Sequence, residues 1–158
     1  MAMLRVDLRR LSGEPVVTTG SLAPDDVAFD GLAFTFTGPV DVDGTLNETA
    51  DGDFYWRGHV LAKVSGECRR CLEPVEQVID DDIEAVFSNN PDLLDDPSVY
   101  ALPEHPTVVD VAAALREEIA LRVSAFPLCR PDCKGLCVNC GADLNAGPCN
   151  CTAAGTTN

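Results

Sequence analysis

The sequence lacks long apolar runs, and this absence excludes the membrane classes of protein. Its 158 residues contain no stretch of about 20 apolar residues, the length that a membrane-spanning helix needs. The first ten residues are rich in charge and contain no apolar segment long enough for a signal peptide. We therefore expect a cytoplasmic protein that does not insert into a membrane.

Basic residues are also scarce. Eleven lysines and arginines stand against 26 acidic residues, which gives a net charge of −15. A protein that coats nucleic acid needs clustered cations to neutralise phosphates, so we expect no DNA binding, and any RNA contact must be local or pass through a basic protein. Acidic residues gather at 80–82 and 92–96, which we assign to loops. These clusters either attract a basic partner or only keep the protein soluble.

Aromatic residues make up only 6% of the chain, whereas apolar residues of all kinds make up 46%. The core is therefore expected to be aliphatic and modest in size. A chain of this length fits one domain, or one domain with a small appendage. Residues 1–30 are expected to be irregular apart from a short strand at 5–10.

Alternating apolar and polar residues predict an antiparallel sheet, with the clearest strand at 54–64. A period of two over eleven residues is typical of a half-exposed strand. A second strand is predicted at about 75–87, and a weaker alternation at 32–46 is interrupted by a Gly-Pro pair. The connection at 66–74 then places a Cys-x-x-Cys sequence at the tip of a hairpin.

One helix is predicted at about 108–125, after an acidic, proline-containing segment at 88–106 that we assign to a loop. Asp110 is suited to cap its N-terminus, and Pro127 is expected to end it. Four apolar residues fall at four-residue steps on one stripe, as packing against a sheet requires. They are Val111, Leu115, Ile119 and Val123.

The sequence predicts a β-rich domain at 1–127, a cysteine-rich zinc-binding segment at 128–151 and a disordered tail at 152–158. The middle segment has too few large side chains to build a core of its own. The expected fold class is α+β. An antiparallel sheet carries the Cys-x-x-Cys hairpin, one helix packs on the sheet, and zinc staples the C-terminal tail.

The eight cysteines form four close pairs along the chain. The pairs are Cys68 and Cys71, Cys129 and Cys133, Cys137 and Cys140, and Cys149 and Cys151. Zinc prefers four tetrahedral ligands, and soft thiolates suit it well. The cysteines therefore predict one or two bound Zn²⁺ ions.

Chain order and reach favour one division of these cysteines. The last four, from Cys137 to Cys151, would form a local site. The hairpin pair would join Cys129 and Cys133 and tie the tail to the sheet. A rival arrangement has one zinc ion in the tail and leaves Cys68 and Cys71 free.

Other interpretations of the cysteines fit the sequence less well. Disulfides suit a secreted chain, and a thioredoxin-like pair lies at the start of a helix, whereas strands flank Cys68 and Cys71. A catalytic zinc usually keeps an open position beside three protein ligands. His59 and His105 have no nucleophile partner in the sequence, and no phosphate-binding loop is found. We therefore predict no enzymatic activity.

Several cysteine-containing strings are similar to those of a known family. Residues 67–74 read Glu-Cys-Arg-Arg-Cys-Leu-Glu-Pro, and residues 126–129 read Phe-Pro-Leu-Cys. Lys-Gly-Leu-Cys-Val-Asn-Cys-Gly follows at 134–141, and Cys-Asn-Cys at 149–151. These strings resemble the YceD-like family of large ribosomal RNA subunit accumulation proteins, in its long-tailed bacterial branch with a C-terminal cysteine cluster.

The resemblance implies a role in the synthesis, processing or stability of large-subunit ribosomal RNA. It also implies a link to a small basic ribosomal protein. In the short-tailed branch of the family, a His/Cys pair lies near the position of Cys129 and Cys133, which favours their grouping with the hairpin pair.

We therefore expect a non-enzymatic factor in large-subunit assembly, needed for 23S rRNA accumulation, processing or stability. Its partner would be large-subunit precursor RNA or a basic large-subunit protein. Arg69, Arg70 and Lys134 would contact RNA phosphates from zinc-rigidified loops, unless Arg69 and Arg70 only neutralise thiolate charge. The alternatives are a zinc-containing RNA-processing enzyme and a thiol redox sensor with free thiols at Cys68 and Cys71.

Overall fold

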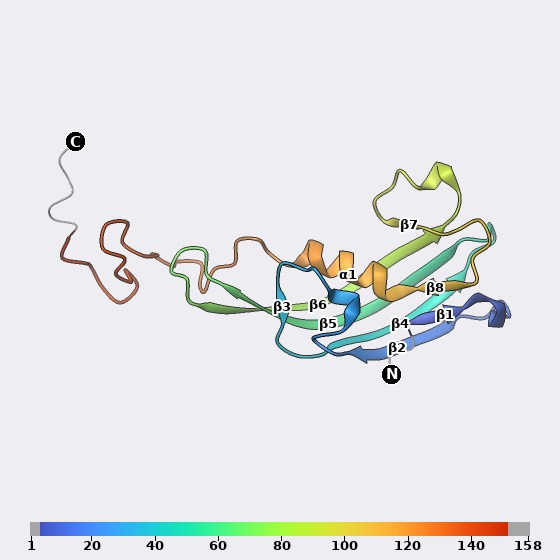
Figure 1. Ribbon diagram of the computed structural model, residues 1–158, viewed down its shortest axis with the longest axis horizontal. Helices are drawn as coiled ribbons and strands as arrows, with labels where there is room; N and C mark the ends of the chain where they lie inside the picture. The colour runs from blue at the N-terminus through green and yellow to red at the C-terminus, as the bar shows by residue number, and fades with distance from the viewer. Residues whose placement is uncertain (1–3, 152–158) are drawn as a thin grey trace.

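The computed structural model describes residues 4–151 and shows an elongated protein. A curved sheet and one helix form one end, and the cysteine-rich C-terminal segment extends from the other (Figure 1). The segment at 152–158, which the sequence predicts to be disordered, lies outside the described residues.

Six strands form the main sheet, in the order β2-β4-β5-β6-β7 with β3 paired to β5. They are β2 (Val16–Leu22), β3 (Thr35–Phe36), β4 (Val40–Glu48), β5 (Phe54–Glu67), β6 (Pro74–Ser88) and β7 (Val99–Ala101). All paired strands are antiparallel except β6 and β7, which are parallel. The predicted α+β class is confirmed, and β5 and β6 form the predicted hairpin with Cys68 and Cys71 at its tip.

Two strands form where the sequence predicts irregular chain. β2 lies within the segment at 1–30 and pairs with β4 along its whole length. β7 lies within the segment at 88–106 and pairs only with the last three residues of β6. Both owe their extended backbone to a neighbouring strand rather than to a strong local pattern. The acidic residues at 80–82, assigned to a loop by sequence, lie instead in the middle of β6.

The other elements are β1 (Arg5–Asp7), β8 (Val108–Asp110), α1 (Val111–Arg122) and the 3-10 helices η1 (Leu8–Arg10), η2 (Val27–Phe29) and η3 (Pro91–Leu93). The helix is shorter than predicted at both ends. Residues 108–110 pair with β1 instead, and Val123 is already extended, with ψ 120°. Asp110 caps the helix as predicted, because its carboxylate accepts a hydrogen bond from the Ala112 N–H at 3.0 Å.

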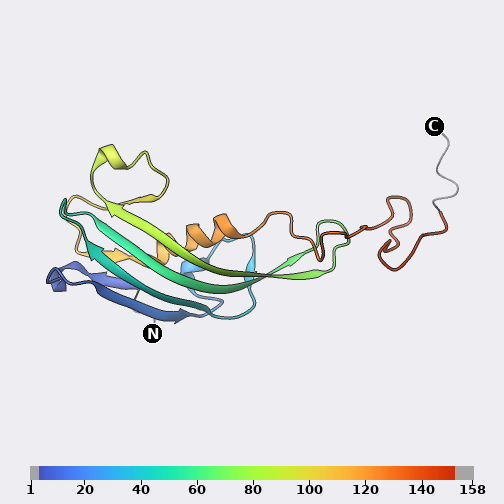
Figure 2. The same cartoon turned by 180° about the vertical axis from the view of Figure 1, so that it is seen from behind.

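The core lies on one face of the main sheet. Alternate side chains of β4, β5 and β6 are buried against α1, β1 and β8. They include Val42, Leu46, Trp56, Val60 and Ile83. Within the described residues, no element covers the opposite face of the sheet (Figure 2). His59 lies on this open face, where its side chain is 50% exposed.

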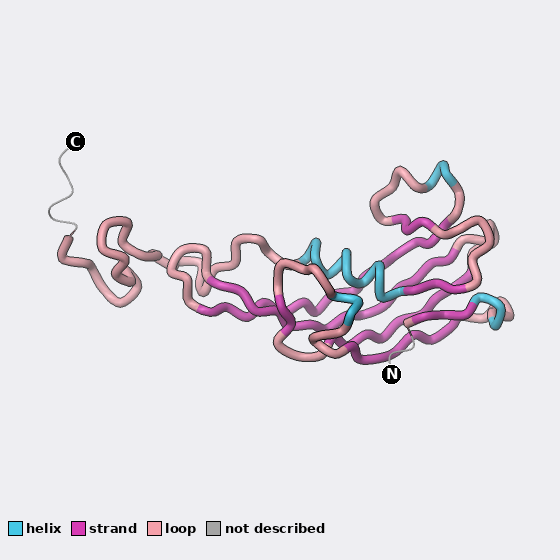
Figure 3. Tube along the Cα trace, in the orientation of Figure 1, coloured by secondary structure: helices cyan, strands magenta, loops and turns pink. Residues whose placement is uncertain are grey.

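The β5–β6 hairpin extends beyond the part of the sheet that α1 covers. Its cross-strand pairs continue to Glu67 and Pro74, which places the tip beyond the end of α1 (Figure 1). After α1 the chain runs toward this tip as a loop and continues past it to residue 151 (Figure 3). In the described part of the chain, no helix has the length and hydrophobicity needed to cross a bilayer.

Candidate metal centres

The tip of the hairpin and the start of the tail bring four thiols together, and we call this group the hairpin centre. The sulfurs of Cys68, Cys71, Cys129 and Cys133 lie within 4.8 Å of one another. Cys68 and Cys133 are 3.8 Å apart, and Cys71 and Cys129 are 3.6 Å apart, measured between Sγ atoms. A tetrahedral ion with metal–sulfur distances of about 2.3 Å separates its ligands by about 3.8 Å. The donor set and its spacing therefore fit a four-thiolate metal ion.

The remaining four cysteines form a second group, which we call the tail centre. The sulfurs of Cys137, Cys140, Cys149 and Cys151 also lie within 4.8 Å of one another. None of the eight cysteines, all of which are described, forms a disulfide. The grouping is the one that chain order and reach favour, whereas binding of an ion by these thiols stays a prediction.

The same backbone turn presents the first cysteine pair of each centre. The N–H of Leu72 donates to the carbonyl of Cys68, and that of Gly141 donates to the carbonyl of Cys137, each at 2.9 Å. In both turns the N–H of the first cysteine donates to the carbonyl five residues later, at 2.8 Å. Leu72 and Gly141 thus occupy equivalent positions, with φ of 64° and 75°.

Leu72 is a costly residue at this position. It is the sole non-glycine residue with positive φ in the described chain. The left-handed conformation costs a residue with a Cβ atom about 1–2 kcal/mol. Its side chain is also 59% exposed, so burial does little to offset the strain.

Backbone amides favour ionisation of one thiol in each centre. Burial opposes ionisation of Cys68, but hydrogen bonds from surrounding backbone N–H groups lower its pKa to about 6. Backbone N–H groups of Cys140 and Asn139 lower the pKa of Cys137 to about 6. The close approach of the thiols opposes ionisation of the others. The hydrogen bond that Cys151 shares with Cys137 raises the pKa of Cys151 to about 12. A bound cation would relieve this crowding and allow all four thiols to ionise.

Two polar side chains bond to Cys133, one from the hairpin and one from the tail itself. The Arg70 guanidinium donates to the Cys133 carbonyl at 2.8 Å. The Asn145 side-chain amide donates to the Cys133 sulfur at 3.3 Å and lowers the pKa of that thiol. Asn145 also accepts a hydrogen bond from the Lys134 N–H at 2.8 Å. It therefore contacts the hairpin centre although it lies between cysteines of the tail centre, and no sequence pattern pointed to it.

The three basic residues expected to contact RNA lie at this end of the protein in different surroundings. Arg70 is exposed, but its guanidinium bonds to the tail as described. The Arg69 guanidinium lies 4.6 Å from the centroid of the Phe126 ring, at cation–π distance. Lys134 is exposed, and its side chain forms no ion pair with a described residue. Of the three, Lys134 has the charge most open to a partner.

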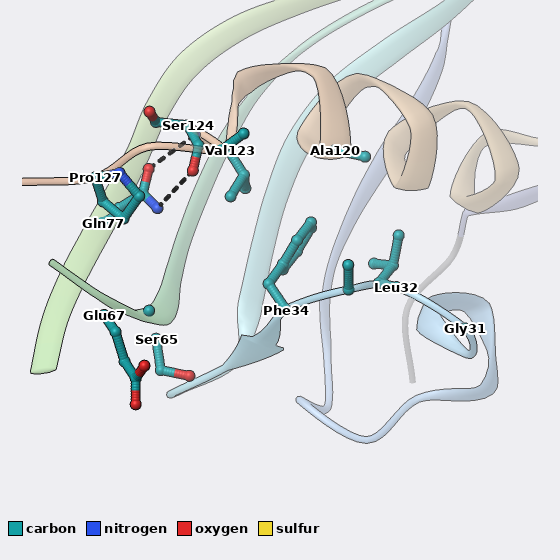
Figure 4. A pocket seen from close by; sticks show the side chains of 13 residues that line it. Gly31, Leu32, Phe34, Ser65, Glu67, Gln77, Ala120, Val123, Ser124 and Pro127 are labelled. Atoms are coloured by element: carbon teal, nitrogen blue, oxygen red, sulfur yellow. Dashed lines mark hydrogen bonds between the residues drawn. The ribbon is translucent and has the colours of Figure 1, made fainter. Parts of the chain in front are cut away.

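A cavity of about 530 Å³ lies where the tail leaves α1, between the loop before β3 and the stem of the hairpin (Figure 4). Phe34 and Pro127 form part of its wall, and Glu67 is the one ionisable residue among those described as lining it. Gln77 fixes the exit of the tail, because it accepts from the Ser124 N–H at 2.9 Å and donates to the Ser124 carbonyl at 3.2 Å. This lining lacks the paired acid and base that general acid–base catalysis uses.

The fold and the two thiol groups define a class of protein. It is a small α+β protein in which a long hairpin and a C-terminal tail carry two four-cysteine groups suited to metal ions. The family described as "Large ribosomal RNA subunit accumulation protein YceD" matches residues 56–157, more than half of the chain. The chain belongs to this family, as its cysteine strings predicted.

Individual relatives differ in how much of the chain they cover. An uncharacterised protein of Mycobacterium tuberculosis is 29% identical over 157 residues, covering 92% of this chain and 72% of that protein. A Zea mays protein named "Large ribosomal RNA subunit accumulation protein YCED homolog 1, chloroplastic" is 41% identical over 44 residues, covering 27% of this chain and 15% of its own. No solved structure matches significantly. The family thus supports a role in ribosome biogenesis.

Proposed function

We propose that this protein is a non-enzymatic cytoplasmic factor in assembly of the large ribosomal subunit, needed for accumulation, processing or stability of 23S rRNA. Membership of the YceD family carries the proposal. The name of the maize relative supports the same pathway. The catalytic alternative has less support, because the cavity beside the hairpin stem offers a single ionisable group, the Glu67 carboxylate.

Each cysteine centre is proposed to hold one Zn²⁺ through four thiolates. Soft sulfur donors at tetrahedral spacing suit zinc better than hard cations. Four protein ligands leave no open position for a substrate, so the ions would supply rigidity. The hairpin centre would fix the tail on the sheet, and the tail centre would fold a segment that lacks a hydrophobic core.

Charge is divided unequally along the molecule, which supports separate contacts for RNA and protein. The cysteine end, residues 66–74 and 124–151, contains four basic and four acidic residues. The body, residues 4–65 and 75–123, contains seven basic and 22 acidic residues. Because phosphates are repelled by the body, precursor RNA would approach the cysteine end. A basic large-subunit protein would suit the body.

The proposal is tested by a low-salt pull-down of tagged, zinc-loaded protein from its own cells, followed by identification of RNA and proteins. Enrichment of large-subunit precursor RNA or of a basic large-subunit protein is expected. Recovery of neither from zinc-loaded protein would contradict the assembly function.

Lys134→Glu is expected to lower recovery of precursor RNA about fivefold. The variant replaces an exposed cation at the cysteine end by an anion, which repels the RNA phosphates. Lys63→Glu is the matched control. It changes the net charge equally, but on the open face of β5, where Lys63 is 53% exposed. Quantitative PCR of the recovered RNA measures both. Equal losses would argue against a local contact at Lys134.

Leu72→Gly is expected to retain both zinc ions and to stabilise the hairpin turn by about 0.5–1 kcal/mol, because glycine adopts positive φ without strain. The rate of zinc transfer to a chromogenic chelator measures this effect. Leu72→Ala serves as the control, since alanine keeps a Cβ atom and the strain. Faster zinc loss from Leu72→Gly than from Leu72→Ala would show that strain does not govern this turn.

A further inference from the structure

The strand β6 has a long free edge. Its inner edge pairs with β5 from Pro74 to Phe87, whereas its outer edge pairs with β7 only from Val86 to Ser88. Nearer the tip, Gln77 binds the backbone of Ser124 through its side chain. Within residues 4–151, no strand or loop backbone bonds to the outer edge at 78–85. Figures 1 and 2 show this edge running between β7 and the hairpin tip.

The same strand carries negative charge only. β6 contains five carboxylates and no cationic side chain. They are Glu76, Asp80, Asp81, Asp82 and Glu84. Asp80, Asp82 and Glu84 share the open face and are 63%, 61% and 58% exposed. The free backbone edge is thus bordered by accessible carboxylates.

The partners of the three open-face carboxylates come from β5, on the inner side, whereas Asp81 pairs with Arg122 of α1 at 3.1 Å. His59 on β5 contacts Asp80 at 2.8 Å and Asp82 at 3.0 Å. Arg57, also on β5, lies 3.7 Å from Glu84. No cation of the described chain reaches the three carboxylates from the outer side. Each of these three carboxylates therefore has a partner on β5 and none, among the described residues, beyond the outer edge of the sheet.

We propose that the outer edge of β6 at 78–85 binds an extended basic protein segment as an added strand. Free backbone N–H and C=O groups give such a segment its main-chain hydrogen bonds. Alternate side chains of the added strand would lie beside Asp80, Asp82 and Glu84, whose spacing is about 6.6 Å along the strand. The segment that fits therefore carries Lys or Arg at every second position.

Charge selects this occupant over a second copy of the chain. Two β6 edges would bring the carboxylates at 80–84 of both copies together, and like charges on neighbouring strands are destabilising. Acidic residues on an edge also protect it from unspecific pairing. If the acidic residues only protected the edge, the protein would show no preference for a basic strand with alternating charges. This preference can be measured.

The test uses the full zinc-loaded protein and a short synthetic peptide that alternates arginine and threonine. Fluorescence anisotropy at low salt is expected to show binding. Hydrogen exchange is expected to slow at backbone amides of 78–85 when the peptide is added. A peptide of the same composition with its arginines in one block should bind at least about threefold more weakly, because fewer pairs can form. Backbone N-methylation of the alternating peptide should weaken it similarly.

Asp80→Asn with Asp82→Asn is expected to weaken binding of the alternating peptide about fivefold. Asp41→Asn with Asp43→Asn is the matched control, with an expected change below about twofold. Asp41 and Asp43 lie on the open face of β4, where they pair across the strand with Leu61 and His59. Leu61 and His59 pair in turn with Asp80 and Asp82, so the control residues lie in the same rows but two strands from the edge. Equal weakening in both variants, unchanged exchange at 78–85, or equal affinity of the N-methylated peptide would each overturn the proposal.

The inference deepens the proposed function by naming the chemistry of a protein partner, and the two can fail separately. Peptide binding is measured on purified protein, so its absence leaves the pull-down result untouched. Peptide binding with no ribosomal material in the pull-down would instead remove the assembly function and leave the edge site.

Discussion

Replacing Cys68 by serine is expected to lower bound zinc from two ions per chain to one and to release the tail from the hairpin. Cys68 is fully buried, and its sulfur lies 3.8 Å from that of Cys133. A serine hydroxyl stays protonated near neutral pH and is a poor zinc ligand. A structural zinc site contributes about 10 kcal/mol or more to the segment that it organises. The remaining contacts, such as the bond from Arg70 to Cys133, contribute about 1 kcal/mol each.

The body should stay folded in this variant, because the main hydrophobic cluster contains none of the cysteines. Zinc per chain is measured by elemental analysis, tail release by limited proteolysis between 124 and 136, and body folding by the fluorescence of Trp56. Loss of the Trp56 signal together with the zinc would contradict the separation of body and cysteine end.

Cys140→Ser is the matched control for the tail centre. It should also leave one ion per chain, but the new proteolytic cuts should fall within 137–151, and the hairpin should keep Cys129 and Cys133. The rival arrangement, with zinc in the tail alone, gives a different result. In that case the unaltered protein binds one ion, and Cys68→Ser leaves the zinc content unchanged.

Strong local patterns explain how much of this fold the sequence could predict. The period of two at 54–64 identified β5, because one face of that strand contacts the core and the other contacts solvent. The two flanking strands predicted the hairpin tip, and chain order and reach favoured the two groups of thiols that lie together in the structure. The stripe on α1 was visible because Val111, Leu115 and Ile119 are all buried.

Features that depend on distant neighbours could not be predicted from local patterns. β8 exists because Val108 to Asp110 pair with β1, about a hundred residues earlier in the chain. The contact of Asn145 with the Cys133 sulfur depends on how the tail folds back, which no spacing rule gives. The equivalence of Leu72 and Gly141 was detectable, because each directly follows the second cysteine of a Cys-x-x-Cys sequence, but only the backbone angles show the strain.

Gly58→Ala is expected to destabilise the body by about 3 kcal/mol, because the added methyl group clashes with the Trp56 ring. A Cβ atom at Gly58 would lie 2.5 Å from Cζ2 of Trp56 and 2.9 Å from Cα of Gly44, its cross-strand partner. The indole cannot easily move away. It is fully buried, and its Nε1 donates a hydrogen bond to the Thr18 hydroxyl at 2.7 Å. For a chain of this size the loss corresponds to a fall in Tm of about 10 °C.

Gly38→Ala is the control for the loss of backbone freedom, because a Cβ atom there meets nothing within 4 Å. It should change stability by less than about 0.5 kcal/mol. Thermal and urea unfolding measure both variants, and zinc content should stay unchanged in the folded protein. A double-mutant cycle identifies the cause. If the clash with the indole is responsible, Gly58→Ala should cost far less in a Trp56→Leu background, although Trp56→Leu itself lowers stability. An equal cost in both backgrounds would place the strain in the paired backbones of Gly44 and Gly58 instead.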